Sequence, residues 1–175
     1  MKYFLLFTAF CGFSLLHAQT LADAEKILRS TCQKKGETAL RFKKTSSYQD
    51  ENTGITHFYF QQLFNEIPIR GAHAGVHLDR AGNLVHLTYQ PAPVDQLSET
   101  TSVLKLTEAH EISRRERPGS KLFSDDYLIY VFTGDRYRLC HEIHGQTEST
   151  GTYWVIWIDA VTKKAIQVHD RVAEC

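Results

Sequence analysis

The sequence has 175 residues, of which 42% are hydrophobic and 23% are charged, a composition typical of a folded globular protein. That length is enough for one domain or for two small ones. Lys plus Arg and Asp plus Glu each count 20, so the formal net charge is zero. The charges therefore show neither the basic excess that indicates binding to nucleic acid or anionic lipid nor the acidic run typical of a disordered tail.

Residues 1–18 have the pattern of a secretory signal peptide. Lys2 supplies a positive start, residues 3–16 are mostly apolar, and Ala18 offers a small residue for cleavage. The apolar run is too short for a convincing membrane span, and no later run approaches the ~20 residues that a span needs. We therefore expect the mature protein to be secreted to the extracellular space, with no membrane association after signal cleavage.

The number and spacing of the cysteines agree only in part with those of an exported, disulfide-bonded protein. Cys11 lies in the signal peptide, and the bulky Phe before it argues against lipidation at that position. Cys32, Cys140 and Cys175 remain, an odd number, so one disulfide with one free thiol and no disulfide at all are both possible. None has C-x-x-C spacing, so redox or zinc-knuckle chemistry has no support. Cys175 is the last residue, which is how a fragment of a longer open reading frame might end.

The first half of the mature chain predicts a helix followed by strands. A helix is expected over about 20–33, because apolar residues recur there on one helical face and Gly36 follows as a stop signal. A short strand near 39–43 and a polar hairpin loop over 46–54 come next. Residues 56–89 then alternate with period two around Gly-containing and Pro-containing turns, which predicts an antiparallel meander of three strands with one apolar face.

The second half repeats this order. Pro91, Pro93 and a polar tail make residues 91–102 the best candidate linker. An amphipathic helix is expected over 107–117, with Thr107 as its cap. Four strands are then expected over 127–133, 137–144, 152–159 and 165–169. Residues 153–158 are apolar on both faces and should lie centrally in their sheet. The simplest architecture is α+β, with two units that each pack a helix on an antiparallel sheet.

The histidine motifs do not match a zinc peptidase. Such a site needs His-Glu-x-x-His, because only an i, i+4 pair places both imidazoles on one helical face. His110 begins such a motif, but its fifth position is Arg114, a cation in place of a ligand. His141 and His144 are three residues apart in an expected strand, where their side chains should point to opposite faces.

The remaining polar clusters favour plain structural interpretations. His73 and His77, with His86 opposite on the neighbouring strand, could bind a metal but equally suit a solvated face, and His57 beside aromatic residues suits a packing role. Asp125 and Asp126 fit a solvated turn better than paired catalytic acids. Aromatic residues are expected in the sheet core, and no basic groove supports stacking of nucleic acid. With no nucleophile elbow, P-loop or dinucleotide motif either, we predict no catalytic, cofactor-binding or metal-binding residues and no cofactor.

The meander contains a distinctive set of residues: Gly54, Ile67-Pro68-Ile69, Asp79, Gly82, Asn83 and the run Thr56-His57-Phe58-Tyr59-Phe60-Gln61-Gln62. This set resembles the fungalysin/thermolysin propeptide (FTP) domain, and it looks closer to the fungalysin branch than to the thermolysin branch. Residues 153–166, Tyr-Trp-Val-Ile-Trp-Ile-Asp-Ala-Val-Thr-Lys-Lys-Ala-Ile, resemble the closing strands of a PepSY-like propeptide module. The two matches together span most of residues 40–172.

The resemblance implies a two-module prosegment that assists the folding of a secreted zinc metallopeptidase and keeps it inactive until cleaved away. It implies two cystatin-like modules, with domains at 19–90 (FTP-like) and 103–175 (PepSY-like) joined by the linker 91–102. Where the family has Asn-Gly and Thr-Gly, this sequence has Asn65-Glu66 and Thr162-Lys163. If these turns keep a positive φ, each side chain costs on the order of 1 kcal/mol.

Three hypotheses for function remain open. The first is a propeptide that inhibits a metallopeptidase, in cis or in trans, through surface complementarity and without chemistry of its own. The second is the front part of a metallopeptidase precursor whose catalytic domain lies beyond Cys175. The third is a free-standing secreted binding module with an unrelated ligand. In all three the chain itself is not an enzyme.

Overall fold

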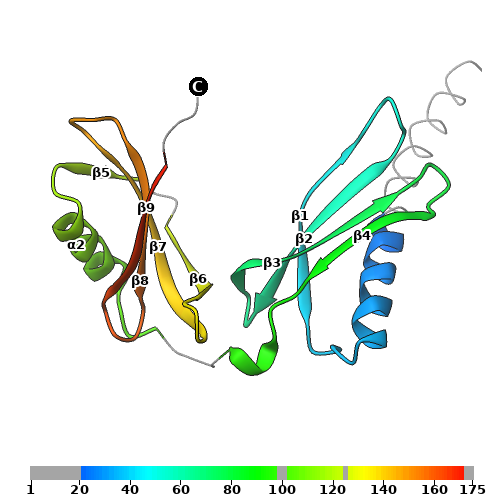
Figure 1. Cartoon of the computed structure of the whole chain (residues 1–175), viewed down its shortest axis with the longest axis horizontal. Coiled ribbons are helices and arrows are strands. Elements are labelled where there is room, and N and C mark those ends of the chain that lie inside the picture. The colour runs from blue at the N-terminus through cyan, green and yellow to red at the C-terminus, as the bar shows by residue number, and fades with distance from the viewer. Residues whose placement is uncertain (1–20, 98–101, 124–125, 172–175) are drawn as a thin grey trace, which may run out of the picture. The chain divides into compact units, whose positions relative to one another are not determined.

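The computed structural model describes residues 21–97, 102–123 and 126–171 (Figure 1). The predicted signal peptide and Cys175 lie outside these residues. The described chain divides into two compact units. Unit 1 comprises the residues up to Leu63 together with Gly71–Ala92, and unit 2 comprises Phe64–Arg70 together with the residues from Pro93 onward. The predicted domain boundaries stay a prediction.

Unit 1 packs a helix against one face of a sheet. Residues 21–34 are helical, and the strands are β1 (Arg41–Gln49), β2 (Thr56–Phe64), β3 (Ile67–Leu78) and β4 (Leu84–Gln90). The helix buries Ala24, Leu28 and Cys32 on the apolar face of β2 and β3, which consists of Phe58, Phe60, Ala74, Val76 and Leu78. The predicted period-two alternation of β2 and β3 is therefore confirmed, and it defines a core face and an outer face.

The described part of unit 2 contains residues 67–70 of β3, together with η1 (Val94–Gln96), α2 (Leu106–Glu116) and the strands β5 (Ser120–Leu122), β6 (Tyr127–Phe132), β7 (Tyr137–Thr147), β8 (Tyr153–Asp159) and β9 (Ala165–Arg171). β8 pairs with β7 on one side and β9 on the other. On one face its Trp154, Ile156 and Ile158 pack with Ala109 of α2, and on the other its Val155 and Trp157 join a second cluster. β8 is thus covered on both faces, as predicted.

Gly145 of β7 is required by the packing of β8. It pairs in register with Trp154, and a Cβ at position 145 would lie 2.3 Å from the Trp154 ring. The indole therefore occupies the space above the glycine.

Among the described helices, none has the length and apolar character needed to cross a bilayer.

The predicted fold class, two cystatin-like modules that each pack a helix on their own antiparallel sheet, is wrong. The nine strands belong to one mixed sheet with the order β1-β2-β3-β6-β7-β8-β9, in which β4 pairs with β3 and β5 with β7. The pairing that makes it mixed lies in unit 2, where Ile69 of β3 pairs in parallel with Tyr130 of β6. Strand pattern predicts which residues face a core, but not which strand edges pair.

Several element boundaries also differ from the predicted ones. β1 continues to Gln49, through residues expected in a loop, because a register shift between Lys44 and Ser46 keeps the later residues paired with β2. Lys105, and not Thr107, is the N-cap of α2. The three-residue strand β5 was not predicted, since so short a run carries no periodic signal.

The two turns without the family's glycine have a left-handed backbone. Asn65 and Glu66 have φ of 49° and 62°, and Lys163 has φ of 60°. The condition under which a side chain at these positions costs free energy is therefore met. Two successive positive-φ residues between β2 and β3 are typical of a type I′ turn, for which Asn-Gly is the preferred pair.

Replacing Glu66 with glycine should stabilise the protein. Glu66 is exposed and no interaction of its side chain is found within the described residues, so Glu66→Gly removes backbone strain and nothing else. We expect the free energy of unfolding to rise by about 0.5–1 kcal/mol. Urea denaturation followed by the fluorescence of Trp154 and Trp157 measures it in unit 2, to which residue 66 belongs.

Glu148→Gly is the matched control. Glu148 is also an exposed turn glutamate of unit 2, but its φ is not positive. Glycine there only adds freedom to the unfolded chain, so the variant should be neutral or less stable. Equal effects of the two substitutions would mean that Glu66 carries no strain.

Candidate contact surface

The outer face of the unit 1 sheet carries a row of five rings across four strands. They alternate along their strands with the core residues, and we call them the aromatic–histidine face: Tyr48 of β1, His57 and Tyr59 of β2, His77 of β3 and His86 of β4. Ring centroids lie 4.5 Å apart for Tyr48 and His57, 5.8 Å for Tyr59 and His77, and 5.5 Å for His77 and His86. The helix at residues 21–34 packs on the opposite face of the sheet.

The centre of this face is a direct contact between two imidazoles. His57 Nδ1 and His77 Nδ1 lie 2.6 Å apart, so one nitrogen donates its proton and the other accepts it. Burial lowers the pKa of His77 below its ordinary value, and the positive charges of His57 and His86 lower it further. His77 therefore stays neutral to a lower pH than an exposed histidine does.

The sequence placed some of these residues correctly. His86 lies opposite His77 in register, as predicted. His73 was expected beside His77 and His86, but it contacts the Gly71 carbonyl oxygen. The third histidine of the aromatic–histidine face is His57, which contacts His77. Tyr48 was missed because it was assigned to a loop. Within the described ranges no group of three or more His, Cys, Asp or Glu could hold a metal ion.

The other histidine motif lies in unit 2 and divides as predicted between two faces. His141 is buried and contacts the Leu104 carbonyl oxygen at 3.0 Å, whereas His144 contacts the carboxylate of Glu142 at 2.9 Å. The prediction of a solvated turn at Asp126 is wrong. Its side chain is 2% exposed, because it contacts His110 of α2 and accepts the His144 backbone N–H. Asp125 lies outside the described residues.

Glu142 is a buried carboxylate surrounded by four polar groups. Oε2 accepts hydrogen bonds from Arg70 at 3.0 Å and from Trp157 Nε1 at 2.7 Å. Oε1 accepts one from the Tyr127 hydroxyl at 2.8 Å and contacts His144 at 2.9 Å. Burial raises the pKa of Glu142, but the hydrogen bonds from Trp157 and Tyr127 and the charge of Arg70 outweigh it, so the pKa is lowered.

The described cysteines are both free and buried. Cys32 accepts a hydrogen bond from the Tyr89 hydroxyl, and burial raises the pKa of the Cys140 thiol to about 12. A buried thiol of this kind is inert as a nucleophile. The absence of catalytic, cofactor-binding and metal-binding residues in the chain as a whole stays a prediction.

Glu142→Gln should destabilise unit 2 by about 2–3 kcal/mol, because charge-assisted hydrogen bonds are lost and an amide donor faces other donors. Since the folded pKa of Glu142 is lowered, its contribution is present above the ordinary value of 4.5 and is lost as pH falls through the folded pKa. Urea denaturation between pH 7 and pH 3 should therefore show the two proteins converging in acid. Glu148→Gln, an exposed control, should leave stability within ~0.5 kcal/mol.

His77 should titrate below its ordinary pKa of 6.5 when followed by NMR. His57→Ala removes both a covering ring and a positive neighbour, so the pKa of His77 should rise toward 6.5 in that variant. The sign for stability follows: a lowered histidine pKa gives stability that is complete above 6.5 and declines as pH falls toward the folded pKa. His73→Ala, which alters a histidine outside the cluster, should leave the titration of His77 unchanged.

Two solved structures share a distant likeness with the chain. One is the Bacillus megaterium YpeB C-terminal domain, with 14% identity and a TM-score of 0.46 over 87% of this chain and 65% of that one. The other is a candidate lipoprotein from Clostridium difficile 630, with 13% identity and a TM-score of 0.31 over 86% and 92%. Both TM-scores are below 0.5, so neither likeness carries an argument. A search of curated proteins found no match.

A family model matches part of unit 1 and the hairpin that joins its strands. Residues 41–90, from the start of β1 to the end of β4, match the Fungalysin/Thermolysin Propeptide Motif. The resemblance of this stretch is thereby confirmed, while the PepSY-like resemblance of the later strands stays a prediction. The chain carries, in the four strands that bear the aromatic–histidine face, the propeptide motif of fungalysin and thermolysin.

Proposed function

We propose that this chain is the prosegment of a secreted zinc metallopeptidase, and that it acts as a non-catalytic inhibitor and folding assistant. The observation that supports this best is the position of the family match. The motif at 41–90 coincides with the strands that bear the aromatic–histidine face. A propeptide motif supports a role beside a peptidase, and not a catalytic domain of its own.

The aromatic–histidine face has the chemistry of a protein contact surface. Tyrosine is enriched where one partner anchors in another, because its ring gives contact area at low entropy cost and its hydroxyl finds a hydrogen bond. Tyr48 is 55% exposed and stacks on His57, so it is held in place before binding. We assign inhibition to docking of this face on the peptidase.

The proposal extends to organisation and location. Residues 1–18 serve as the signal peptide, 19–90 form the FTP-like domain, 91–102 the linker and 103–175 a PepSY-like domain. The peptidase partner is extracellular and is joined in cis or bound in trans. Reading the gene beyond codon 175 tests the cis arrangement, because a His-Glu-x-x-His motif in frame would encode the catalytic domain.

Inhibition by the purified chain tests the proposed function. Added to a fungalysin-type or thermolysin-type peptidase, it should slow hydrolysis stoichiometrically and remain uncleaved. Tyr48→Ala should weaken inhibition about tenfold or more, because it removes an exposed anchor while the core face stays intact. The inhibition constant is measured with a fluorogenic peptide substrate.

Tyr153→Ala is the matched control for this experiment. Tyr153 is a tyrosine of similar exposure, 45%, but lies on β8 of unit 2. Its removal should leave the inhibition constant unchanged. If the wild-type chain does not inhibit either peptidase at micromolar concentration, the proposal fails. If both tyrosine variants inhibit like wild type, inhibition occurs but not through the aromatic–histidine face.

A further inference from the structure

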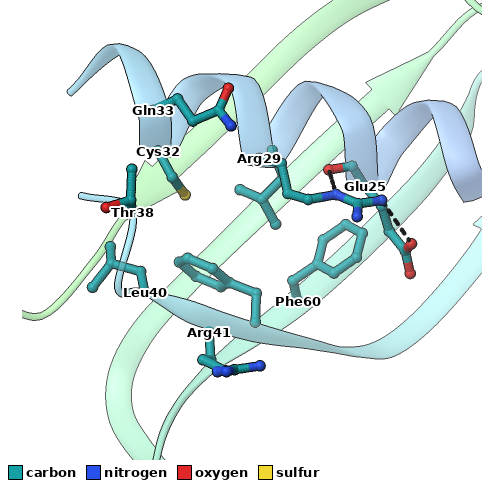
Figure 2. Close-up of a pocket in the computed structure, with 10 residues that line it drawn as sticks. Glu25, Arg29, Cys32, Gln33, Thr38, Leu40, Arg41 and Phe60 are labelled. Atoms are coloured by element: carbon teal, nitrogen blue, oxygen red, sulfur yellow. Dashed lines mark hydrogen bonds and ion pairs between the residues drawn. The ribbon is translucent and has the colours of Figure 1, made fainter. Parts of the chain in front are cut away.

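Unit 1 has a second surface, separate from the aromatic–histidine face, between its helix and β1. A cavity of about 380 Å³ lies there, on the core side of the sheet (Figure 2). Its floor is apolar and consists of Leu28, Cys32, Leu40, Phe42 and Phe60. Its rim is polar, with Glu25, Arg29, Gln33 and Thr38. Such a cavity suits a bulky apolar side chain whose polar neighbours stay at the rim.

The cavity borders an unpaired sheet edge. β1 is the terminal strand of the sheet order, so within the described residues its second edge has no partner. Eight of its nine residues are exposed, and the exception, Phe42, faces the cavity. An edge strand presents alternate N–H and C=O groups that can pair with another strand. A strand added there would lie ~4.8 Å beyond β1 and direct every second side chain toward the helix.

The charge of the edge indicates what would pair with it. Arg41, Lys43 and Lys44 are exposed on β1, and no ion pair of theirs is found among the described residues. Arg29 on the rim is already paired with Glu25. The edge therefore has a net positive charge, which favours an acidic partner. A second copy of this chain pairing through β1 would bring the same cations together.

We propose that the β1 edge and its cavity bind an extended acidic peptide segment. The segment adds as a further strand on β1, inserts a bulky apolar side chain into the cavity, and places its carboxylates beside Arg41, Lys43 and Lys44. This is strand addition, in which main-chain hydrogen bonds supply affinity and a side-chain pocket supplies specificity. The inference does not depend on the propeptide role, because the edge and the aromatic–histidine face are different surfaces of unit 1.

Fluorescence anisotropy with a labelled nine-residue peptide of alternating glutamate and leucine, the length of β1, tests the proposal on the purified chain. We expect saturable binding at micromolar concentration. Gln33→Trp, which fills the cavity from its rim, should weaken binding at least about tenfold, and so should Lys43→Glu combined with Lys44→Glu. Lys34→Trp, at an exposed neighbour that does not line the cavity, should bind like wild type.

Each alternative has its own outcome. No saturable binding of the acidic peptide to wild type overturns the proposal. Equal binding of a lysine–leucine peptide overturns the charge argument, and equal binding of a backbone N-methylated peptide overturns strand pairing. If Gln33→Trp binds normally, or Lys34→Trp weakens binding equally, the cavity is not the site. A dimer in sedimentation that the peptide displaces would assign the edge to a second copy.

Discussion

Unit 2 depends on one carboxylate that is almost completely shielded from water. The carboxylate of Glu142 is 1% exposed, and an ion so buried is tolerated only if its lone pairs are satisfied. The indole of Trp157, the hydroxyl of Tyr127 and the guanidinium of Arg70 each donate to it. Arg70 also lies 4.6 Å above the Trp157 ring. Because these donors come from β3, β6 and β8, the carboxylate fixes three strands around β7.

The contact between Arg70 and Glu142 lies beside the pairing of β3 with β6 within unit 2. Arg70 is adjacent to Ile69, the residue that pairs in parallel with Tyr130 of β6. The single parallel pair between β3 and β6 contributes little stability by itself. Beside it, however, Arg70 donates a hydrogen bond to the buried carboxylate of Glu142, 72 positions away in sequence. We infer that the ion pair and the pairing of β3 with β6 stabilise each other. Replacing Arg70 removes the positive charge that offsets the burial of the Glu142 carboxylate, whereas Arg70 itself is 40% exposed.

The sequence predicted local features far better than long-range ones. The alternation of Phe58 and Phe60 with His57 and Tyr59 was sufficient to define the core face and the outer face, because side chains alternate whatever the strand pairs with. The sequence also identified residue 66 as the position where a side chain would be strained if the backbone had a positive φ, and φ there is 62°. Neither the fold class nor the environment of Glu142 could be predicted in this way, since both depend on which distant strands meet. Asp126 was misassigned for the same reason: its partner His110 lies on α2.

The titrating groups of the two units respond to acid in different ranges. The lowered pKa of His77 means that stability is lost as pH falls from 6.5 toward the folded value, because the unfolded chain binds the proton first. Glu142 keeps its charge until pH falls below 4.5. Mild acid therefore acts on unit 1 at the centre of the aromatic–histidine face, where His77 becomes charged in contact with His57. The core face beneath consists of apolar side chains and does not titrate, so mild acid should alter the contact surface before it unfolds the sheet that carries it.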